Sequence, residues 1–381
     1  MATAALIGFL LLAAAVLAAR GAVWYRSTDF FCFYSGARAV GLGQDPYDPV
    51  VWGSLTGGLY EDPRHVLVPA SCPTQYGYPL WTAVLLLPLQ LLPIEVASTA
   101  WMALSLGAAI FGARALWQAN RGAPRGAALF AVLVFSSQPF WLLLISGQMS
   151  GVMLGLTGAL AAFAARRREV AAGVSLAMLA FKPQLAALTL PAILVRFALE
   201  RRRIAVAAAL ATGAVLVIVP MLFVPWWPVE WLGDVGRRRL QVVTLLPTAW
   251  GFAADVFGNA AWGAVVSLVL IAVCVLLVRR TDTLALLALA TPLSLVVTPY
   301  AWSYDFLILA CAWAFVLARV TPARGALAIT LRLGVVAVAS VLPWVLYVVA
   351  FGRGGETLSM LVPAATALLV AAATRVTVTA A

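Results

Sequence analysis

Long apolar stretches recur along the chain from Leu6 to Val370, and short clusters of arginine separate them. An α-helix needs about 20 apolar residues to cross the hydrocarbon core of a bilayer. Most stretches carry a polar interruption near the middle, and these interruptions are Ser146–Ser150, Phe181–Gln184, Trp226–Trp250, Thr298–Asp305 and Phe351–Glu356. The pattern predicts hairpins of membrane helices, and therefore an all-α polytopic membrane protein.

The arginines predict how these helices are oriented, because cytoplasmic loops of membrane proteins collect Arg and Lys. Placing every cluster in the cytoplasm puts every polar interruption on the opposite, outer side. The first stretch, 4–19, is kept as a helix rather than a cleaved signal peptide. With a further span near 96–113, we expect about 12 crossings and two cytoplasmic termini. The clusters are Arg114/Arg121/Arg125, Arg166–Arg168, Arg196/Arg201–Arg203, Arg279/Arg280, Arg319/Arg324/Arg332 and Arg375.

Two segments fit this pattern less well. The legs 170–181 and 184–195 have about 12 residues each, or roughly 18 Å of helix. We expect a hairpin whose legs end early in a protein-lined, wet cavity, because one long helix would place an arginine triplet outside. The segment 78–92 is apolar but framed by prolines. Since a full crossing there would invert all later clusters, we expect an outer juxtamembrane or re-entrant helix.

We therefore expect one integral membrane domain over residues 1–381, with two large outer loops. The first loop, 20–93, contains juxtamembrane helices, and the second loop covers 225–259. No internal repeat or flexible linker is visible in the sequence.

Composition excludes a soluble protein and a nucleic-acid-binding protein. Hydrophobic residues make up 64% of the chain and charged residues 10%, whereas soluble domains carry about 25% charged residues. The net charge of +11 does not indicate nucleic acid, because the arginines alternate with apolar spans. The Ala- and Arg-rich usage favours a GC-rich bacterial genome, and therefore a bacterial plasma membrane.

Aspartates in the first loop are the first candidates for chemistry. Asp29 lies near a membrane boundary among aromatic residues, where burial disfavours a charged carboxylate and suits a general base or acid. The alternative is a capping residue after Ser27-Thr28. Asp45, Tyr47 and Asp48 belong to Gly43-Gln-Asp-Pro-Tyr-Asp48, where Asp-Pro turns are common structural punctuation.

Gln148 and Lys182 lie in two of the outer turns. Gln148 is a polar donor or a plain turn residue. Lys182 is the only lysine of the chain and precedes Pro183. Its ammonium could bind a lipid phosphate, or the side chain could snorkel to the membrane interface.

The remaining outer candidates are basic and aromatic. Arg237, Arg238 and Arg239 lie in the second loop among tryptophans, which act first as interfacial anchors. Because these arginines break the positive-inside trend, they are candidates for binding an anionic headgroup or a phosphate. The Tyr300, Trp302, Tyr304 and Asp305 cluster is similar. His65 has no visible metal partners and is set aside.

The cysteines divide into two pairs. Cys274 and Cys311 fall inside apolar spans and are expected to be buried. Cys32 and Cys72 both fall in the first loop, and an outer loop is oxidising, so we predict a disulfide between them.

All candidate polar residues share the outer face, which indicates a lipid-borne substrate. The rival class is a transporter or flippase, but transporters show repeats and charged helices at mid-membrane. The spans here are almost free of charge.

The motif order resembles glycosyltransferase family 87, the polyprenol-phosphate-mannose-dependent mannosyltransferases of the GT-C superfamily. The resemblance covers roughly residues 20–305 and implies a GT-C-like helical bundle. The matching motifs are Asp29, Gly43-Gln-Asp-Pro-Tyr-Asp48, Tyr78-Pro-Leu, Gly147-Gln148, Lys182-Pro-Gln184 and a late Thr-Pro-x-x-Trp segment.

The resemblance implies an inverting transfer of a hexose, with mannose expected first. Asp29 would deprotonate the hydroxyl of a glycolipid acceptor, and Lys182 with Arg237–Arg239 would neutralise the phosphate of a polyprenyl-phosphate donor. No metal or cofactor is required, because the phosphate is already a good leaving group. Many relatives carry a histidine where this chain has Tyr300, so the resemblance does not extend an acid or phosphate-orienting role, or one acceptor, to this position. Among enzymes, a GT-C transferase for arabinose or glucose is the alternative.

Overall fold

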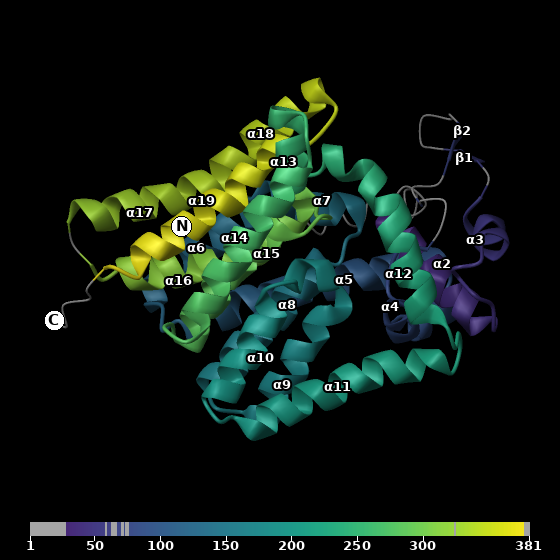
Figure 1. The fold of residues 1–381 in the computed structure, drawn as a ribbon, viewed down its shortest axis with the longest axis horizontal. Helices are drawn as coiled ribbons and strands as arrows, with labels where there is room; N and C mark the ends of the chain where they lie inside the picture. Colours follow the sequence, from purple (N-terminus) through teal and green to yellow (C-terminus); the bar gives the residue numbers. More distant parts are fainter. Residues whose placement is uncertain are drawn as a thin grey trace.

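The structure is a computed structural model that describes residues 28–57, 59–61, 67–69, 72, 76–323 and 325–376. The predicted first helix, 4–19, and His65 lie outside these residues. The described chain is almost entirely helical (Figure 1). The exception is a short antiparallel hairpin in the first loop, in which Tyr60 of β1 (Leu59–Glu61) pairs with Val68 of β2 (Leu67–Pro69).

The helices follow one another with short connections. In chain order they are α2 (Asp29–Gly41), α3 (Pro49–Thr56), α4 (Leu80–Leu85), η2 (Leu87–Leu91), α5 (Ile94–Ala119), α6 (Pro124–Ser136), α7 (Gln138–Ser146), α8 (Ser150–Ala165), α9 (Glu169–Met178), η3 (Leu179–Phe181), η4 (Pro183–Ala186), α10 (Thr189–Leu199), α11 (Arg203–Met221), α12 (Trp227–Arg238), η5 (Arg239–Leu245), α13 (Ala249–Phe257), α14 (Ala261–Val278), α15 (Thr283–Val297), η6 (Ser303–Leu309), α16 (Ala310–Val320), α17 (Ala326–Val336), η7 (Ala337–Val341), α18 (Leu342–Arg353), η8 (Thr357–Met360) and α19 (Leu361–Ala373).

Several of these helices can cross a membrane. Among the described residues, five helical segments are long and apolar enough, and the α6–α7 pair, bent by 52°, would be a sixth. Five further apolar helices are shorter, and they contain α8, α9, α10, α15 and α19. The polytopic, all-helical class is therefore confirmed. The count of about 12 crossings stays a prediction, because shorter helices and the first predicted span must be included to reach it.

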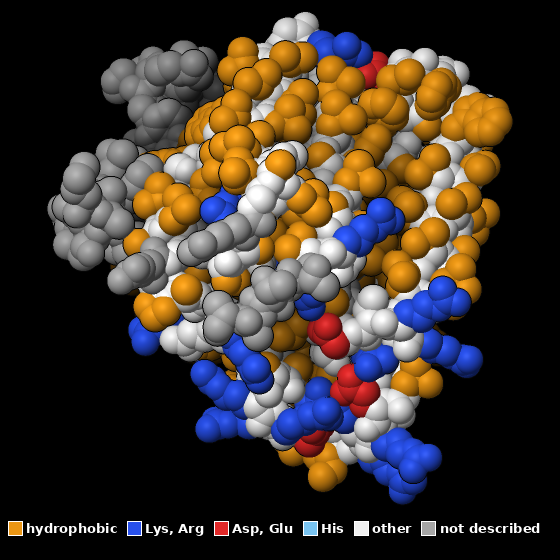
Figure 2. Space-filling view, turned by 90° about the vertical axis from the view of Figure 1, so that its left-hand side faces the viewer, with side chains coloured by type: hydrophobic (Ala, Val, Ile, Leu, Met, Phe, Trp, Pro, Cys, Tyr) orange, Lys and Arg blue, Asp and Glu red, His pale blue; other side chains and the backbone are white. Residues whose placement is uncertain are grey.

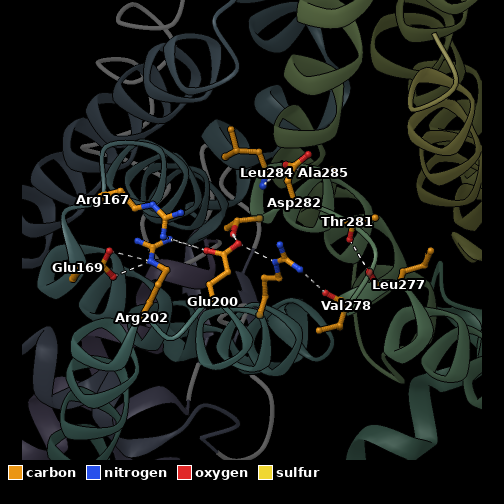
Figure 3. A network of polar contacts seen from close by, with 12 residues as sticks. Arg167, Glu169, Glu200, Arg202, Leu277, Val278, Thr281, Asp282, Leu284 and Ala285 are labelled. Carbon is orange, nitrogen blue, oxygen red and sulfur yellow. Dashed lines mark hydrogen bonds and ion pairs between the residues drawn. The ribbon is translucent and has the colours of Figure 1, made fainter. Parts of the chain in front are cut away.

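The arginine clusters gather at one end of the bundle, which we call the arginine end and define by the contacts drawn in Figure 3. Arg167 Nη1 lies 3.4 Å from Glu200 Oε2, and Arg202 Nε lies 2.8 Å from Glu169 Oε2. Thr283 donates to Glu200 at 3.1 Å. In Figure 2, most Lys and Arg side chains lie on the lower part of the view and hydrophobic side chains cover the upper part.

These contacts confirm the predicted hairpin over 170–195. The chain leaves the arginine end at Glu169, reaches Lys182 and is back beside Arg167 at Glu200. The 13 residues from Glu169 to Phe181 rise about 20 Å at the helical pitch. Lys182 therefore lies well away from the arginine end, between two short helical legs.

Three arginines end helices at this end in a left-handed conformation. Arg121, Arg167 and Arg201 have φ between 54° and 56° and follow the last turns of α5, α8 and α10. This position usually favours glycine, but a cation there interacts favourably with the carbonyl end of the helix. The same residues that mark topology in the sequence thus also terminate the helices.

Close packing of α5 against α8 forms the centre of the bundle. A Cβ on Gly112 would lie 2.4 Å from the Leu154 carbonyl oxygen, and one on Gly151 would lie 2.4 Å from that of Ser105. Small residues allow two membrane helices to approach in this way. The pairing places the first residue of α8 beside the middle of α5.

The described helices of the first loop lie at the end of the bundle opposite the arginines. Its helices α2, α3 and α4 gather beside α12 of the second loop (Figure 1). The predicted disulfide between Cys32 and Cys72 is present, with Cα atoms 5.4 Å apart. The segment 78–92 consists of the short helices α4 and η2, as expected for a segment that does not cross. Trp81 of α4 donates to the Ala180 carbonyl at 3.0 Å.

Candidate active site

Asp29 is the first residue of α2, and Thr28 is the residue before the helix. Its side chain is partly covered and accepts a hydrogen bond from the amide of Gln148. Burial raises the pKa of Asp29 to about 6, against the lowering effects of the Gln148 hydrogen bond and the Lys182 charge. A carboxylate with a pKa near neutrality can accept a proton at working pH.

A tight turn brings Gln148 to Asp29. Gly147 ends α7 with φ +67°, and its carbonyl accepts a hydrogen bond from Trp101 Nε1 at 2.9 Å. A Cβ on Gly147 would lie 3.2 Å from Cβ atoms of Phe30 and Thr28. Glycine is therefore required both for the backbone conformation and for the close approach to α2. Gln148 itself is fully buried.

Lys182 lies between η3 and η4 and is only 1% exposed. Its Nζ atom lies 2.5 Å from Asp305 Oδ1, 3.2 Å from Gln148 Oε1 and 4.9 Å from the centre of the Tyr304 ring. The snorkelling interpretation is therefore wrong, because the ammonium is buried and ion-paired instead of reaching the interface. The sequence-predicted residues Asp29, Gln148 and Lys182 form one hydrogen-bonded chain.

Asp305 completes this chain; the sequence placed it in the aromatic and acidic cluster with Tyr300, Trp302 and Tyr304, but gave it no role of its own. It lies in the first turn of η6 and is fully buried. Its Oδ2 accepts from the Trp302 backbone N–H at 3.1 Å, and its Oδ1 also accepts from Ser150 Oγ at 3.4 Å. An acid in an apolar stretch is usually paired with a basic residue. Because Lys182 is the only lysine of the chain, it was the feature of the sequence that could have indicated this pairing.

A second layer holds the turn that carries Asp305. The Ser303 backbone N–H donates to Glu356 Oε2 at 2.9 Å, and Gln138 Nε2 donates to Ser303 Oγ at 3.0 Å. Burial raises the pKa of the Glu356 carboxyl. The Glu356 N–H in turn donates to the Leu245 carbonyl at 2.8 Å, so the last hairpin and the second loop meet behind the site.

The other first-loop candidates shape the loop itself. Asp48 caps α3 by accepting from Val50 N at 2.7 Å, which is the structural role considered for it. Tyr47 donates to the Tyr78 carbonyl at 2.7 Å. Asp45 accepts from the Tyr47 N–H at 2.8 Å, and the carboxyl group of Glu230 of α12 lies near it.

The remaining candidates border the site to different degrees. The Tyr78 ring packs edge-on against Phe33 of α2 at 4.7 Å. Trp302 Nε1 donates to the Tyr300 hydroxyl at 3.2 Å, directly before the Asp305 turn. Arg237 and Arg238 lie in the last turn of α12, and the described contacts do not include their side chains.

Fold and site define a multi-pass membrane protein with a buried acid–lysine–amide chain at the end opposite its arginine clusters. The sequence model of glycosyltransferase family 87 matches residues 76–299, and the chain belongs to this family. It is a membrane glycosyltransferase, which decides against the transporter hypothesis. The match includes Gln148 and Lys182, while Asp29 and Asp305 lie outside it. No curated protein and no solved structure matches the chain.

Proposed function

We propose that the protein transfers a hexose, with mannose as the first candidate, from a polyprenyl-phosphate sugar to a lipid-linked glycan acceptor. Asp29 acts as the general base. The single observation that carries this proposal is the contact of the partly covered Asp29 carboxylate with Gln148, which is in turn bound to the buried Lys182. These two motifs come from the matched family region and meet an acid of the first loop.

In the proposed reaction, Asp29 takes the proton of an acceptor hydroxyl. The hydroxyl oxygen then attacks the anomeric carbon of the donor sugar from the face opposite the phosphate. The bond between that carbon and the phosphate oxygen breaks, and polyprenyl phosphate leaves with the electron pair. Backside displacement inverts the anomeric configuration.

The charges near the site suggest how the donor phosphate would be bound. Asp305 balances the charge of Lys182 at 2.5 Å, so Lys182 adds little net positive charge for a phosphate. Arg237 and Arg238 at the end of α12 are therefore the stronger candidates for the phosphate. Helix α12 is held over the first loop by Trp227, whose ring packs edge-on against Trp81 at 5.1 Å.

An apolar cavity supports a lipid-linked substrate. A cavity of about 350 Å³ lies between α10 and α14, and its lining extends from Leu188 to Leu199 and Arg279 at the arginine end. Leu188, Ala192 and Val195 line one side, and Ile271 and Val275 line the other. Such an apolar surface suits a lipid chain rather than a soluble nucleotide sugar, and it lies along the bundle rather than at Asp29.

The position of the arginine clusters supports a site that faces away from the cytoplasm. The positive-inside rule places that end in the cytoplasm, and Lys182 lies about 20 Å away along α9 and η3. The site would then face the periplasm or the cell exterior.

The test supplies membranes containing the enzyme with radiolabelled polyprenyl-phosphate mannose, arabinose or glucose. We expect a labelled glycolipid from one donor, mannose first, and none with the Asp29→Asn variant. Labelling from nucleotide sugars in membranes that cannot form polyprenyl-phosphate sugars would overturn the lipid-linked donor.

A further inference from the structure

Asp305 and Lys182 form an ion pair that is almost completely removed from solvent, with exposed side-chain fractions of 0% and 2%. Burying two charges together is often no better for stability than an apolar pair of similar size. Pairing also leaves the ammonium in place to make a second contact, the 3.2 Å hydrogen bond to Gln148 Oε1. The ion pair therefore fixes the position of the Lys182 ammonium beside Gln148.

The chemistry of the four groups fixes the direction of every hydrogen bond. An ammonium only donates and an ionised carboxylate only accepts, whereas a carboxamide does both through different atoms. Because Lys182 donates to Gln148 Oε1, the Gln148 NH₂ group must face Asp29. The opposite orientation would place the amide NH₂ against the ammonium and the amide oxygen against the carboxylate.

Asp305 is itself held firmly, so it can anchor the chain. One carboxylate oxygen accepts from the Trp302 backbone N–H and the other from Ser150 Oγ as well as from Lys182. The Trp302–Asp305 turn is thus closed on itself. A misplaced lysine would release the Gln148 amide, and with it the orientation of the Asp29 carboxylate.

We propose that Asp305 is a positioning residue for sugar transfer, which fixes the Lys182 ammonium so that Gln148 presents its amide hydrogens to Asp29. This inference rests on the proposed function of Asp29 as the base. Asp305 acts through Lys182 and Gln148 and has no direct contact with the reacting atoms in this scheme.

The charges also make Asp305 relevant to the basicity of Asp29. Lys182 lowers the pKa of Asp29, and Asp305 raises it by opposing that effect. The groups that face Asp29 are Gln148 from the α7–α8 turn, Lys182 from the η3–η4 turn, and Asp305 and Tyr304 from η6. Without the Asp305 charge, Lys182 would hold Asp29 more firmly as a carboxylate, which makes it a weaker base.

The experiment measures kcat and kcat/KM against pH for the purified full-length enzyme, using the polyprenyl-phosphate sugar that labels a glycolipid in the membrane assay. For Asp305→Asn we expect kcat to fall on the order of 10- to 100-fold, as for a misplaced reactive group. The neutral carboxamide holds Lys182 less firmly than a carboxylate and no longer opposes its charge, so the acid limb of the pH profile should move down by about one pH unit. The matched control, Asp255→Asn, removes a carboxylate paired with Arg353 at 2.8 Å and should leave the limb in place.

A second variant covers the case in which Asp305→Asn does not fold. The double variant Asp305→Asn/Lys182→Met removes both charges, so it leaves no unpaired buried ion and should recover folded yield. Its acid limb should lie above that of the wild type, because the lowering effect of Lys182 on Asp29 outweighs the raising effect of Asp305.

The possible failures are distinguishable. An acid limb of Asp305→Asn that stays at the wild-type pH, or moves upward, overturns the positioning role. An effect confined to the KM for the donor does so as well, since it would mark a contact with the phosphate. Retained turnover in Asp29→Asn overturns the base assignment instead.

Discussion

Gln148 Oε1 lies 3.2 Å from Lys182 Nζ, and this contact joins two turns that are far apart in the chain. One turn follows α7 and the other interrupts the α9–α10 hairpin. Both turns lie at the end of the bundle opposite the arginines, so the contact depends on two separate hairpins having the same orientation. It places the Gln148 amide between a buried cation and the acid of the first loop.

Asp29→Asn should retain the fold and lose turnover. Asparagine keeps the size of the side chain but cannot take a proton, and loss of a general base costs roughly 10²–10⁴-fold in rate. The measurement is kcat per molecule eluting as a monodisperse species in detergent. Asp45→Asn and Asp48→Asn are the matched controls, since their carboxylates accept backbone hydrogen bonds within the first loop. If either control is inactive while Asp29→Asn turns over normally, the base is misassigned.

The pH dependence should show a single acid limb at about pH 6. Burial raises the pKa of Asp29 to about 6, so below this pH the side chain is protonated and cannot accept a proton. The value of kcat/KM should therefore rise through pH 6 and level off above it. A limb near pH 4, the ordinary range for an aspartate, would contradict the buried environment of the base.

The alternation of apolar stretches and arginine clusters was sufficient to predict the helical class and the arginine end. It also predicted the α9–α10 hairpin, because an unbroken helix would have placed one of the two arginine triplets, Arg166–Arg168 or Arg201–Arg203, on the outer side. Asp29, Gln148 and Lys182 could be selected by their shared face and the family resemblance. Their hydrogen bonds could not be derived, because each comes from a different turn.

The pairing of Asp305 with Lys182 could not be predicted from the sequence. Asp305 was noticed among Tyr300, Trp302 and Tyr304, but its partner lies 123 positions away in the chain. Pairing at such a distance depends on how the hairpins pack, which no local pattern contains. Asp48, by contrast, makes contacts only two and three residues away, and local turn chemistry predicted its structural role.

Lys182→Met should destabilise the protein strongly. It would leave the Asp305 carboxylate buried without a counter-ion, a change that costs about 3–5 kcal/mol. Lys182→Arg should recover part of the loss, because it keeps the charge while changing the geometry. The measurement is the midpoint of thermal unfolding in detergent.

The matched control is Arg353→Met, which breaks an ion pair with Asp255 whose side chains are 47% and 26% exposed. Such a pair contributes at most about 1 kcal/mol. Equal losses of stability in Lys182→Met and Arg353→Met would contradict the buried placement of Lys182.

Breaking the disulfide should loosen the first loop. Cys32 and Cys72 are 40 positions apart, and a native disulfide over a loop of this kind contributes typically 2–4 kcal/mol. Cys32→Ser/Cys72→Ser should therefore increase proteolysis of the first loop and lower kcat, because Cys32 lies one turn from Asp29 on α2. Cys274→Ser, a change at a buried free thiol of α14, is the control. Unchanged proteolysis in the double variant would show that the loop is held by packing alone.

The orientation of the site can be tested by labelling introduced cysteines in intact cells. Val50 of α3 is 80% exposed in the first loop, and the Arg167 side chain is 66% exposed at the arginine end. In a background with Cys274→Ala and Cys311→Ala, the disulfide occupies the two remaining native cysteines. The positive-inside rule predicts that a membrane-impermeant maleimide labels Val50→Cys directly and Arg167→Cys only after permeabilisation. The reverse result would place Asp29 and Lys182 on the cytoplasmic side, where a donor in the outer leaflet could not reach them.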